Sequence, residues 1–293
     1  MTSAIANTSQ KMQPICRARL VAVFLRPRAG LHLGIHQIVA LEGQPVGQTL
    51  PWYNRSIVAA KTLERIESEW NRLSVIRIGK TVELRSTLGV FSVYRPDRVL
   101  TGFAWDSLSL APSLLSSPPR RILLLGMGGG TVVHQCRAFY HEARIDAVEI
   151  DATVIRLARK YFHLPRAQVR AVRADALQFV REASGPYDAI LDDVWPEQGS
   201  AAKPLFAAPD YLAGVCRLLA RDGVYAANLW GVGGRASEIP RAGRMLRPLF
   251  RRMVLLVPPE GPTRALAAMK GREAPPPEAR RRLRGMGLRV KML

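Results

Sequence analysis

The pattern of hydrophobic and polar positions changes character near residue 104. Before this point, short alternating runs are broken by Gly and by Arg-Pro-Asp, which is typical of a small antiparallel β unit. These runs are Leu73–Ile78, Thr81–Leu84 and Gly89–Tyr94. After it, continuous apolar runs alternate with stretches of helical spacing, and this alternation indicates buried parallel strands joined by helices.

The second part of the chain predicts a doubly wound, mostly parallel sheet. Its expected strands are Arg121–Leu125, Arg144–Ile150, Gln168–Val172, Tyr187–Leu191 and Val224–Leu229, with closing strands at Met253–Val257 and Arg264–Met269. Its expected helices are Trp105–Leu115, Val132–Phe139, Ala152–Tyr161, Leu177–Glu182 and Tyr211–Leu219, the last linked to its strand by Arg221–Gly223. The sequence therefore predicts an α/β fold with a small N-terminal antiparallel β unit.

These changes in the sequence pattern divide the chain into four segments. We expect an extension at 1–60, the small β unit at 61–103, the sheet domain at 104–271 and a basic tail at 272–293. Residues 1–60 hold one acid, Glu42, and their composition resembles an organellar transit peptide. A disordered extension or an over-long predicted start would have the same composition.

Composition and charge exclude some classes of protein. Of the 293 residues, 48% are hydrophobic, as in ordinary globular proteins, but apolar stretches such as Leu20–Leu25 are too short to span a bilayer. Three widely spaced cysteines exclude a disulfide framework and favour a reducing compartment, so the cytoplasm is the expected location. The formal net charge of +20 lies mainly in the flanks, since residues 61–234 hold 22 Lys/Arg against 18 Asp/Glu. The basic C-terminal region, 235–293, keeps nucleic-acid binding open.

Candidate site residues stand where the predicted parallel strands end, which is where open α/β sheets bind ligands. Gly126, Gly128, Gly129 and Gly130 form the turn after the first strand, where a ligand can approach the backbone closely. A tight turn that binds nothing would look the same. Glu149 ends the second strand and can accept hydrogen bonds from both ribose hydroxyls, whereas Asp151 is expected to cap the next helix.

The next two strand ends carry further acids. Asp175 and Ala176 end the third strand, where Asp175 can accept a hydrogen bond from an adenine amino group or cap a helix. Asp192 and Asp193 end the fourth strand, and their mutual repulsion would raise one pKa toward that of a general base, although either can instead hold a loop. Together the strand ends predict a nucleoside-containing cofactor without a phosphate chain, since no Walker lysine is present.

Other reactive side chains lack partners in the sequence. His134 has no second ligand at metal spacing, His32 and His36 have no third, and Cys136 has no catalytic dyad partner. We therefore expect no metal site and a packing role for His134. Trp195 and Trp230 follow strand ends, where they either stack on a ligand or fill the rim of the core.

The ordered motifs of this chain resemble those of the spermidine synthase (polyamine aminopropyltransferase) family. The matching segments are Glu67–Asn71, Trp105–Leu108, Leu123–Thr131, Ala147–Asp151, Arg173–Ala176, Tyr187–Asp192, Leu205–Phe206 and Arg221–Gly223. The resemblance covers roughly residues 64–270 and implies the Rossmann-like fold of class I S-adenosylmethionine methyltransferases. It implies aminopropyl transfer from decarboxylated S-adenosylmethionine to an amine, with Glu149 on the ribose and Asp175 with Ala176 on the adenine. It also places Asp192 as a catalytic acid, and Trp105, Asp106 and Trp195 in the substrate pocket. Asp193 joins Asp192 as a catalytic candidate because the two carboxylates are adjacent.

The chain departs from this family's pattern at three places. Gly128 stands where the family usually carries the Asp of this glycine-rich loop, Trp195 replaces the second acid of Asp-x-x-Asp, and Ala104–Asp106 replaces Tyr-His-Glu. Absence of the loop acid favours a donor that keeps its carboxylate, which makes methyl transfer from S-adenosylmethionine an alternative. Two further hypotheses are a non-catalytic adenosyl-binding protein and a nucleic-acid-binding methyltransferase that uses the basic C-terminal region. The sequence leaves the oligomeric state open, with a homodimer as one alternative.

Overall fold

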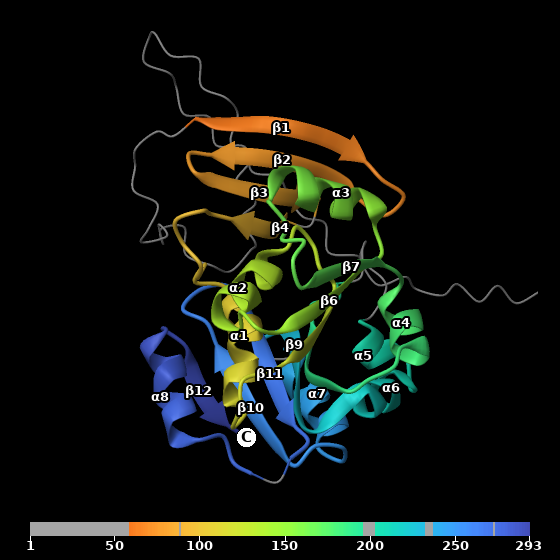
Figure 1. The fold of residues 1–293 in the computed structure, drawn as a ribbon, viewed down its shortest axis with the longest axis vertical. Helices are drawn as coiled ribbons and strands as arrows, with labels where there is room; N and C mark the ends of the chain where they lie inside the picture. The colour runs from red at the N-terminus through yellow and green to blue at the C-terminus, as the bar shows by residue number, and fades with distance from the viewer. Residues whose placement is uncertain (1–58, 88, 196–202, 232–236, 272) are drawn as a thin grey trace, which may run out of the picture. The chain divides into compact units, whose positions relative to one another are not determined.

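Four antiparallel strands form the first sheet (Figure 1). The structure, a computed structural model, describes residues 59–87, 89–195, 203–231, 237–271 and 273–293. The strands are β1 Ala60–Glu67, β2 Arg72–Ile78, β3 Thr81–Ser86 and β4 Gly89–Tyr94, paired in chain order. The predicted β unit is therefore confirmed, but β1 was missed because its register shifts between Thr62 and Glu64 and blurs the alternation. The expectations for residues 1–58 lie outside the described residues.

The second sheet has eight strands in the order β12-β10-β11-β9-β8-β5-β6-β7. Its strands are β5 Arg121–Leu125, β6 Arg144–Glu149, β7 Val169–Arg173, β8 Tyr187–Asp192, β9 Leu219–Trp230, β10 Arg252–Val257, β11 Thr263–Met269 and β12 Arg289–Met292. Five neighbouring strands, β7, β6, β5, β8 and β9, pair in parallel, whereas β11 and β12 pair antiparallel to their neighbours. The predicted α/β fold with a mostly parallel sheet is confirmed.

Helices join and cover these strands. They are α1 Ala104–Leu110, α2 Thr131–Phe139, α3 Ala152–Tyr161, α4 Ala176–Glu182, α5 Pro204–Ala207, α6 Tyr211–Leu218, α7 Ile239–Leu246 and α8 Pro277–Gly285, with a 3-10 turn at Ala111–Leu114. No described helix is both long enough and apolar enough to cross a membrane.

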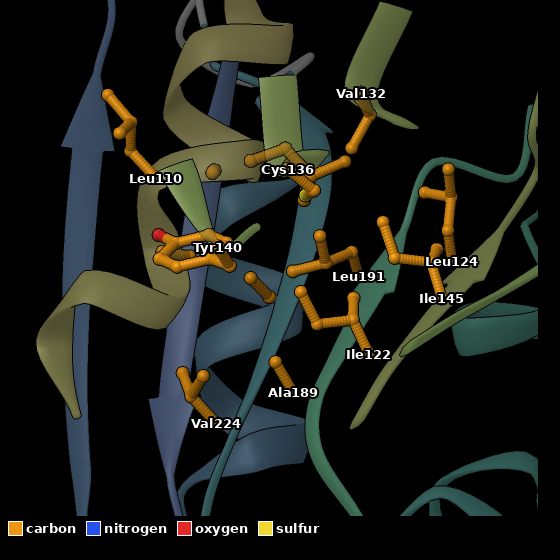
Figure 2. Packing of buried hydrophobic residues seen from close by; sticks show 14 of the residues in the cluster. Leu110, Ile122, Leu124, Val132, Cys136, Tyr140, Ile145, Ala189, Leu191 and Val224 are labelled. Carbon is orange, nitrogen blue, oxygen red and sulfur yellow. The ribbon is translucent and has the colours of Figure 1, made fainter. Parts of the chain in front are cut away.

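Alternate residues of the buried strands enter two core layers. Ile122 and Leu124 of β5 pack with residues of α1, α2 and α8, while Leu123 and Leu125 pack with residues of α4, α6 and α7 on the opposite face. Figure 2 shows Ile122, Leu124 and Leu191 beside Cys136 in the first layer. This two-sided burial explains why β5 reads as an unbroken apolar run.

Helix α3 contacts both sheets. Its Ile155 and Ala158 belong to the first core layer of the large sheet, and its Val154 and Leu157 pack with Val75 and other residues of the small sheet. The small β unit is thereby fixed to the domain that holds the strand ends.

The structure corrects the description of residues 272–293 as a basic tail. Helix α8 buries Ala279 and Leu283, and β12 pairs with β10 at the edge of the large sheet. Four arginines in α8 hide its apolar positions in the sequence. Residues Arg221–Gly223, expected to link a helix to a strand, lie within β9, next to a register shift in its pairing with β8.

Candidate functional site

Three parallel strand ends converge on the glycine-rich loop. Leu125, the last residue of β5, pairs with Val148 of β6 on one side and with Asp192 of β8 on the other. The residues that follow these positions, Glu149 and Asp193, therefore flank the loop that starts at Gly126. The strand order reverses here, because β6 lies on one side of β5 and β8 lies on the other. Such a switch point is where open α/β sheets bind ligands.

The loop closes on its neighbours in a conformation that requires glycine. Gly126 has a φ of +80°, and a Cβ on it would lie 2.6 Å from the carbonyl oxygen of Asp193. The amides of Gly126 and Met127 donate to the carbonyl oxygen of Val148, at 3.0 and 2.9 Å. Gly130 also has a positive φ, +96°, immediately before α2. The glycines thus bring the backbone of this loop against β6 and β8.

Ser92 of β4 contacts the same loop from the small sheet. Its hydroxyl accepts a hydrogen bond from the Gly129 amide at 2.7 Å and donates to the carbonyl oxygen of Phe91. A Cβ on Gly128 or on Gly129 would lie 2.8 Å from Ser92 atoms. Next to it, the Thr131 hydroxyl bonds both the amide and the carbonyl of Val93. Ser92 therefore fills the space that a side chain at residue 128 or 129 would need.

Glu149 presents a half-buried carboxylate at the end of β6. Its Oε2 accepts from the Gly128 amide at 2.9 Å, and its Oε1 accepts from the Asp151 amide at 3.1 Å. Burial raises the pKa of Glu149 to about 7, although these amide bonds lower it, and the nearby charge of Asp151 raises it further. The side chain is thus held by main-chain donors beside the glycine loop.

Asp151 has the capping role that the sequence predicted. Its Oδ1 accepts from the Thr153 amide at 2.8 Å, which satisfies a free donor of the first turn of α3. Its Oδ2 accepts from the Ser68 hydroxyl and the Asn71 amide group of the small sheet. Asp151 therefore joins the two sheets.

Asp175 and Ala176 follow β7. Asp175 is exposed and caps α4, since its Oδ1 accepts from the Gln178 amide at 2.8 Å. Ala176 is buried in the second core layer. Their assignment to an adenine amino group stays a prediction.

Asp192 is only 3% exposed and is held by two buried tyrosines. The hydroxyls of Tyr211 and Tyr225 donate to its Oδ2 at 2.9 and 2.6 Å, and the Val194 amide donates to Oδ1 at 3.2 Å. These bonds use both carboxylate oxygens. The sequence did not associate either tyrosine with the site.

Asp193 directly follows the same strand, β8, and is half-buried. Its Oδ1 accepts from the Asn228 amide group at 2.7 Å and from the indole of Trp195 at 3.1 Å. Burial raises the pKa of Asp193 to about 6, against the opposing effect of Asn228 and the charge of Lys203. Lys203, which the sequence did not single out, is a buried cation close to both aspartates.

Trp105 and Asp106 begin α1, and their expected place in a substrate pocket stays a prediction. Trp105 packs against the first core layer, with its ring edge-on to Phe103. Asp106 is 2% exposed and accepts hydrogen bonds from the amides of Thr101 and Gly102, the Thr101 hydroxyl and the Gln135 side chain. Its carboxylate therefore organises the turn before α1.

We expect Asp106→Ala to reduce stability. The change leaves buried donors of Thr101, Gly102 and Gln135 without their acceptor, at a cost of about 3 kcal/mol. The melting temperature of this variant should be roughly 6–12 °C lower than that of wild type. Asp97→Asn, which removes an exposed partner of Arg95 and Lys80, is the control and should change the midpoint little. A wild-type melting temperature for Asp106→Ala would contradict the assigned role.

The remaining reactive side chains have local partners. A ring nitrogen of His134 lies 2.7 Å from the carbonyl oxygen of Phe162, and burial lowers the pKa of His134. Burial raises the pKa of the Cys136 thiol well above its usual range. Within the described ranges, no three His, Cys, Asp or Glu side chains are grouped to hold a metal ion.

Sequence comparison matches residues 107–232 to the spermine/spermidine synthase domain. The polyamine aminopropyltransferase of Vibrio vulnificus is 32% identical over 130 residues, which cover 43% of each chain. The eEF1A lysine and N-terminal methyltransferase of Mus musculus is 34% identical over 127 residues, which cover 40% of this chain and 18% of the mouse protein. The chain thus spans less than half the length of these relatives.

Structural comparison finds the same fold in a spermidine synthase solved in complex with the transition state analogue AdoDATO. The two structures superpose with a TM-score of 0.60 at 19% sequence identity, over 72% of this chain and 74% of that one. The similarity extends beyond the matched domain, because the superposed part exceeds the 126 positions between residues 107 and 232. The expected fold is therefore confirmed.

Proposed function

We propose that this chain, a divergent relative of the spermidine synthases whose residues 107–232 form a spermine/spermidine synthase domain, transfers a group from an adenosyl donor to a small nucleophile. The donor is S-adenosylmethionine or its decarboxylated form, and the group is methyl or aminopropyl. Relatives named for each chemistry, an aminopropyltransferase and a methyltransferase, each match about two fifths of this chain.

The position of Glu149 carries this proposal. Its carboxylate lies at the end of β6 beside the glycine loop, with Oε2 on the Gly128 amide. A carboxylate there accepts hydrogen bonds from two adjacent ribose hydroxyls, and burial strengthens such bonds. The residues present fit an adenosyl group, because an acceptor at this strand end is the chemistry that a ribose requires. When bound, the donor supplies an electrophilic carbon next to its sulfonium.

Asp193 is the better candidate for a general base than Asp192. With its pKa near 6, Asp193 is ionised at neutral pH yet basic enough to take a proton from an acceptor. Asp192 has both oxygens engaged by Tyr211, Tyr225 and the Val194 amide. We therefore assign proton removal to Asp193 and a positioning role to Asp192.

The neutral lining of the loop favours S-adenosylmethionine over its decarboxylated form. Ser92 fills the space beside Gly128 and Gly129 with an uncharged hydroxyl. An acid there would attract the primary amine of the decarboxylated donor and repel the carboxylate of S-adenosylmethionine. The present lining has no such acid among residues 126–131.

A competition experiment tests the proposal. The purified protein is mixed with equal amounts of S-adenosylmethionine and decarboxylated S-adenosylmethionine, and the retained ligand is identified by native mass spectrometry. Retention of the intact form supports the methyl donor, and retention of the decarboxylated form supports aminopropyl transfer. Retention of neither form contradicts an adenosyl site. Homodimer formation and nucleic-acid binding through residues 235–293 stay predictions.

A further inference from the structure

Lys203 is a lysine that the fold buries next to the proposed acceptor site. It directly precedes α5 and is 4% exposed. Lysine is almost never fully buried unless its charge is paired, because removing an ammonium from water is costly. Its position therefore calls for an explanation in terms of its partners.

Residues just beyond Asp193 hold the ammonium in place. Its Nζ donates to the carbonyl oxygen of Val194 at 2.8 Å and lies 3.6 Å from the centre of the Trp195 ring. A cation over an indole face is the favoured geometry of a cation–π contact. The Trp195 indole in turn donates to Asp193. Lys203, Trp195 and Asp193 thus form one connected group at the end of β8.

The charge of Lys203 and the charges of the acids around it act on one another. Burial lowers the pKa of Lys203, while the charges of Asp192, Asp193 and Glu238 raise it. The charge of Lys203 in turn lowers the pKa of Asp193. The chain therefore carries its own counter-ion for the aspartates at this strand end.

Asn228 leaves an acceptor atom without a partner at the same place. Its amide nitrogen donates to Asp193, but its Oδ1 is buried and accepts no hydrogen bond from any described residue. An unsatisfied buried oxygen costs free energy unless a ligand supplies a donor. The group therefore has capacity for a hydrogen-bond donor, whereas a fixed positive charge, that of Lys203, is already present.

We propose that Lys203 determines acceptor specificity: its ammonium occupies the place beside Asp192 and Asp193 that a cationic amine would take, so the acceptor is an uncharged hydrogen-bond donor. This inference rests on the proposed transferase function. A diamine entering this site brings a second cation next to Lys203. Two like charges close together repel strongly where bulk water does not screen them.

The test measures binding of putrescine, as the cationic probe, by calorimetry and by thermal shift. The proteins are wild type, Lys203→Met, Lys203→Gln and Lys203→Arg, each saturated with S-adenosylhomocysteine. Wild type and Lys203→Arg should show no saturable binding of putrescine. Lys203→Met and Lys203→Gln should bind putrescine at least about tenfold more tightly than wild type, since one charge-assisted bond becomes available. Their melting temperatures should rise with putrescine.

Lys270→Gln is the matched control. Lys270 also donates to main-chain carbonyls, those of Cys216 and Leu219, but it lies away from the aspartates. Loss of this lysine should change stability without any gain of putrescine binding. Lys203→Gln keeps a hydrogen-bond donor for Val194. If Lys203→Met does not fold, the comparison of Lys203→Gln with wild type still tests the inference.

Two outcomes overturn the inference. One is saturable putrescine binding by wild type as tight as that of the Lys203 variants, and the other is a folded Lys203→Gln protein that gains none. Binding of S-adenosylhomocysteine is measured in the same samples. Its absence in wild type would contradict the proposed function instead, so the two failures are distinguishable.

Discussion

Glu149→Gln is expected to weaken adenosyl-ligand binding by roughly 100-fold or more, because two charge-assisted bonds to the ribose are lost at about 1.5–3 kcal/mol each. The amide that replaces Oε1 or Oε2 also brings an N–H group toward the Gly128 or Asp151 amide, where the carboxylate accepts a bond. The binding constant of S-adenosylhomocysteine, measured by calorimetry, checks this expectation.

The binding should also depend on pH with a defined sign. The ligand requires the ionised carboxylate as an acceptor, while burial raises the pKa of Glu149 to about 7 in the ligand-free protein. Above this value the ligand meets a carboxylate, and below it binding must first remove a proton. Affinity is therefore highest above pH 7 and falls about tenfold per unit as the pH decreases further. In Glu149→Gln this dependence should disappear.

Asp146→Asn is the matched control for this prediction. Asp146 lies on the same strand, β6, but its carboxylate bonds Arg170 and Tyr187, three residues before the strand end. Its replacement should alter stability and leave ligand affinity within about threefold of wild type. If Glu149→Gln binds the ligand like wild type, the carboxylate does not hold the ribose.

Strand positions were predictable because their burial leaves a local signature. Leu123 and Leu125 face one core layer while Ile122 and Leu124 face the other, so β5 contains apolar residues without interruption. The acids that end neighbouring strands were predictable for a related reason, since polar side chains reappear where the apolar run of each strand stops. Asp151 was correctly assigned as a helix cap because capping depends on residues two and three positions away.

Contacts between distant segments left no such signature. Lys203 contacts Val194 and Trp195 from the far side of a connection, and nothing in the residues around Lys203 marks it as buried. Tyr211 and Tyr225 lie on α6 and β9, and only the fold brings both hydroxyls to Asp192. The absence of an acid from the loop was visible in the sequence. Ser92, which occupies the space beside the loop, is 37 residues away from Gly129 along the chain.

Introducing an acid into the loop at Gly129, next to Gly128, is expected to destabilise this protein. In Gly129→Asp, the new Cβ would lie 2.8 Å from the Cβ of Ser92 and 3.3 Å from the Phe162 ring. Overpacking costs about 1–3 kcal/mol, and displacement of Ser92 also weakens its bond with the Gly129 amide, which adds about 1 kcal/mol. Denaturant unfolding should therefore show a loss of roughly 2–4 kcal/mol.

Removing Ser92 at the same time should reverse part of this loss, because the two residues compete for one space. Ser92→Gly alone costs about 1 kcal/mol through the lost hydrogen bond and the flexibility of glycine in a strand. If the clash is the cause, Ser92→Gly with Gly129→Asp will be more stable than the sum of the two single changes by about 1–3 kcal/mol. Additive effects in this double-mutant cycle would contradict the assignment. The double variant should also retain decarboxylated S-adenosylmethionine in preference to the intact form, since its loop again carries an acid that attracts a primary amine and repels a carboxylate.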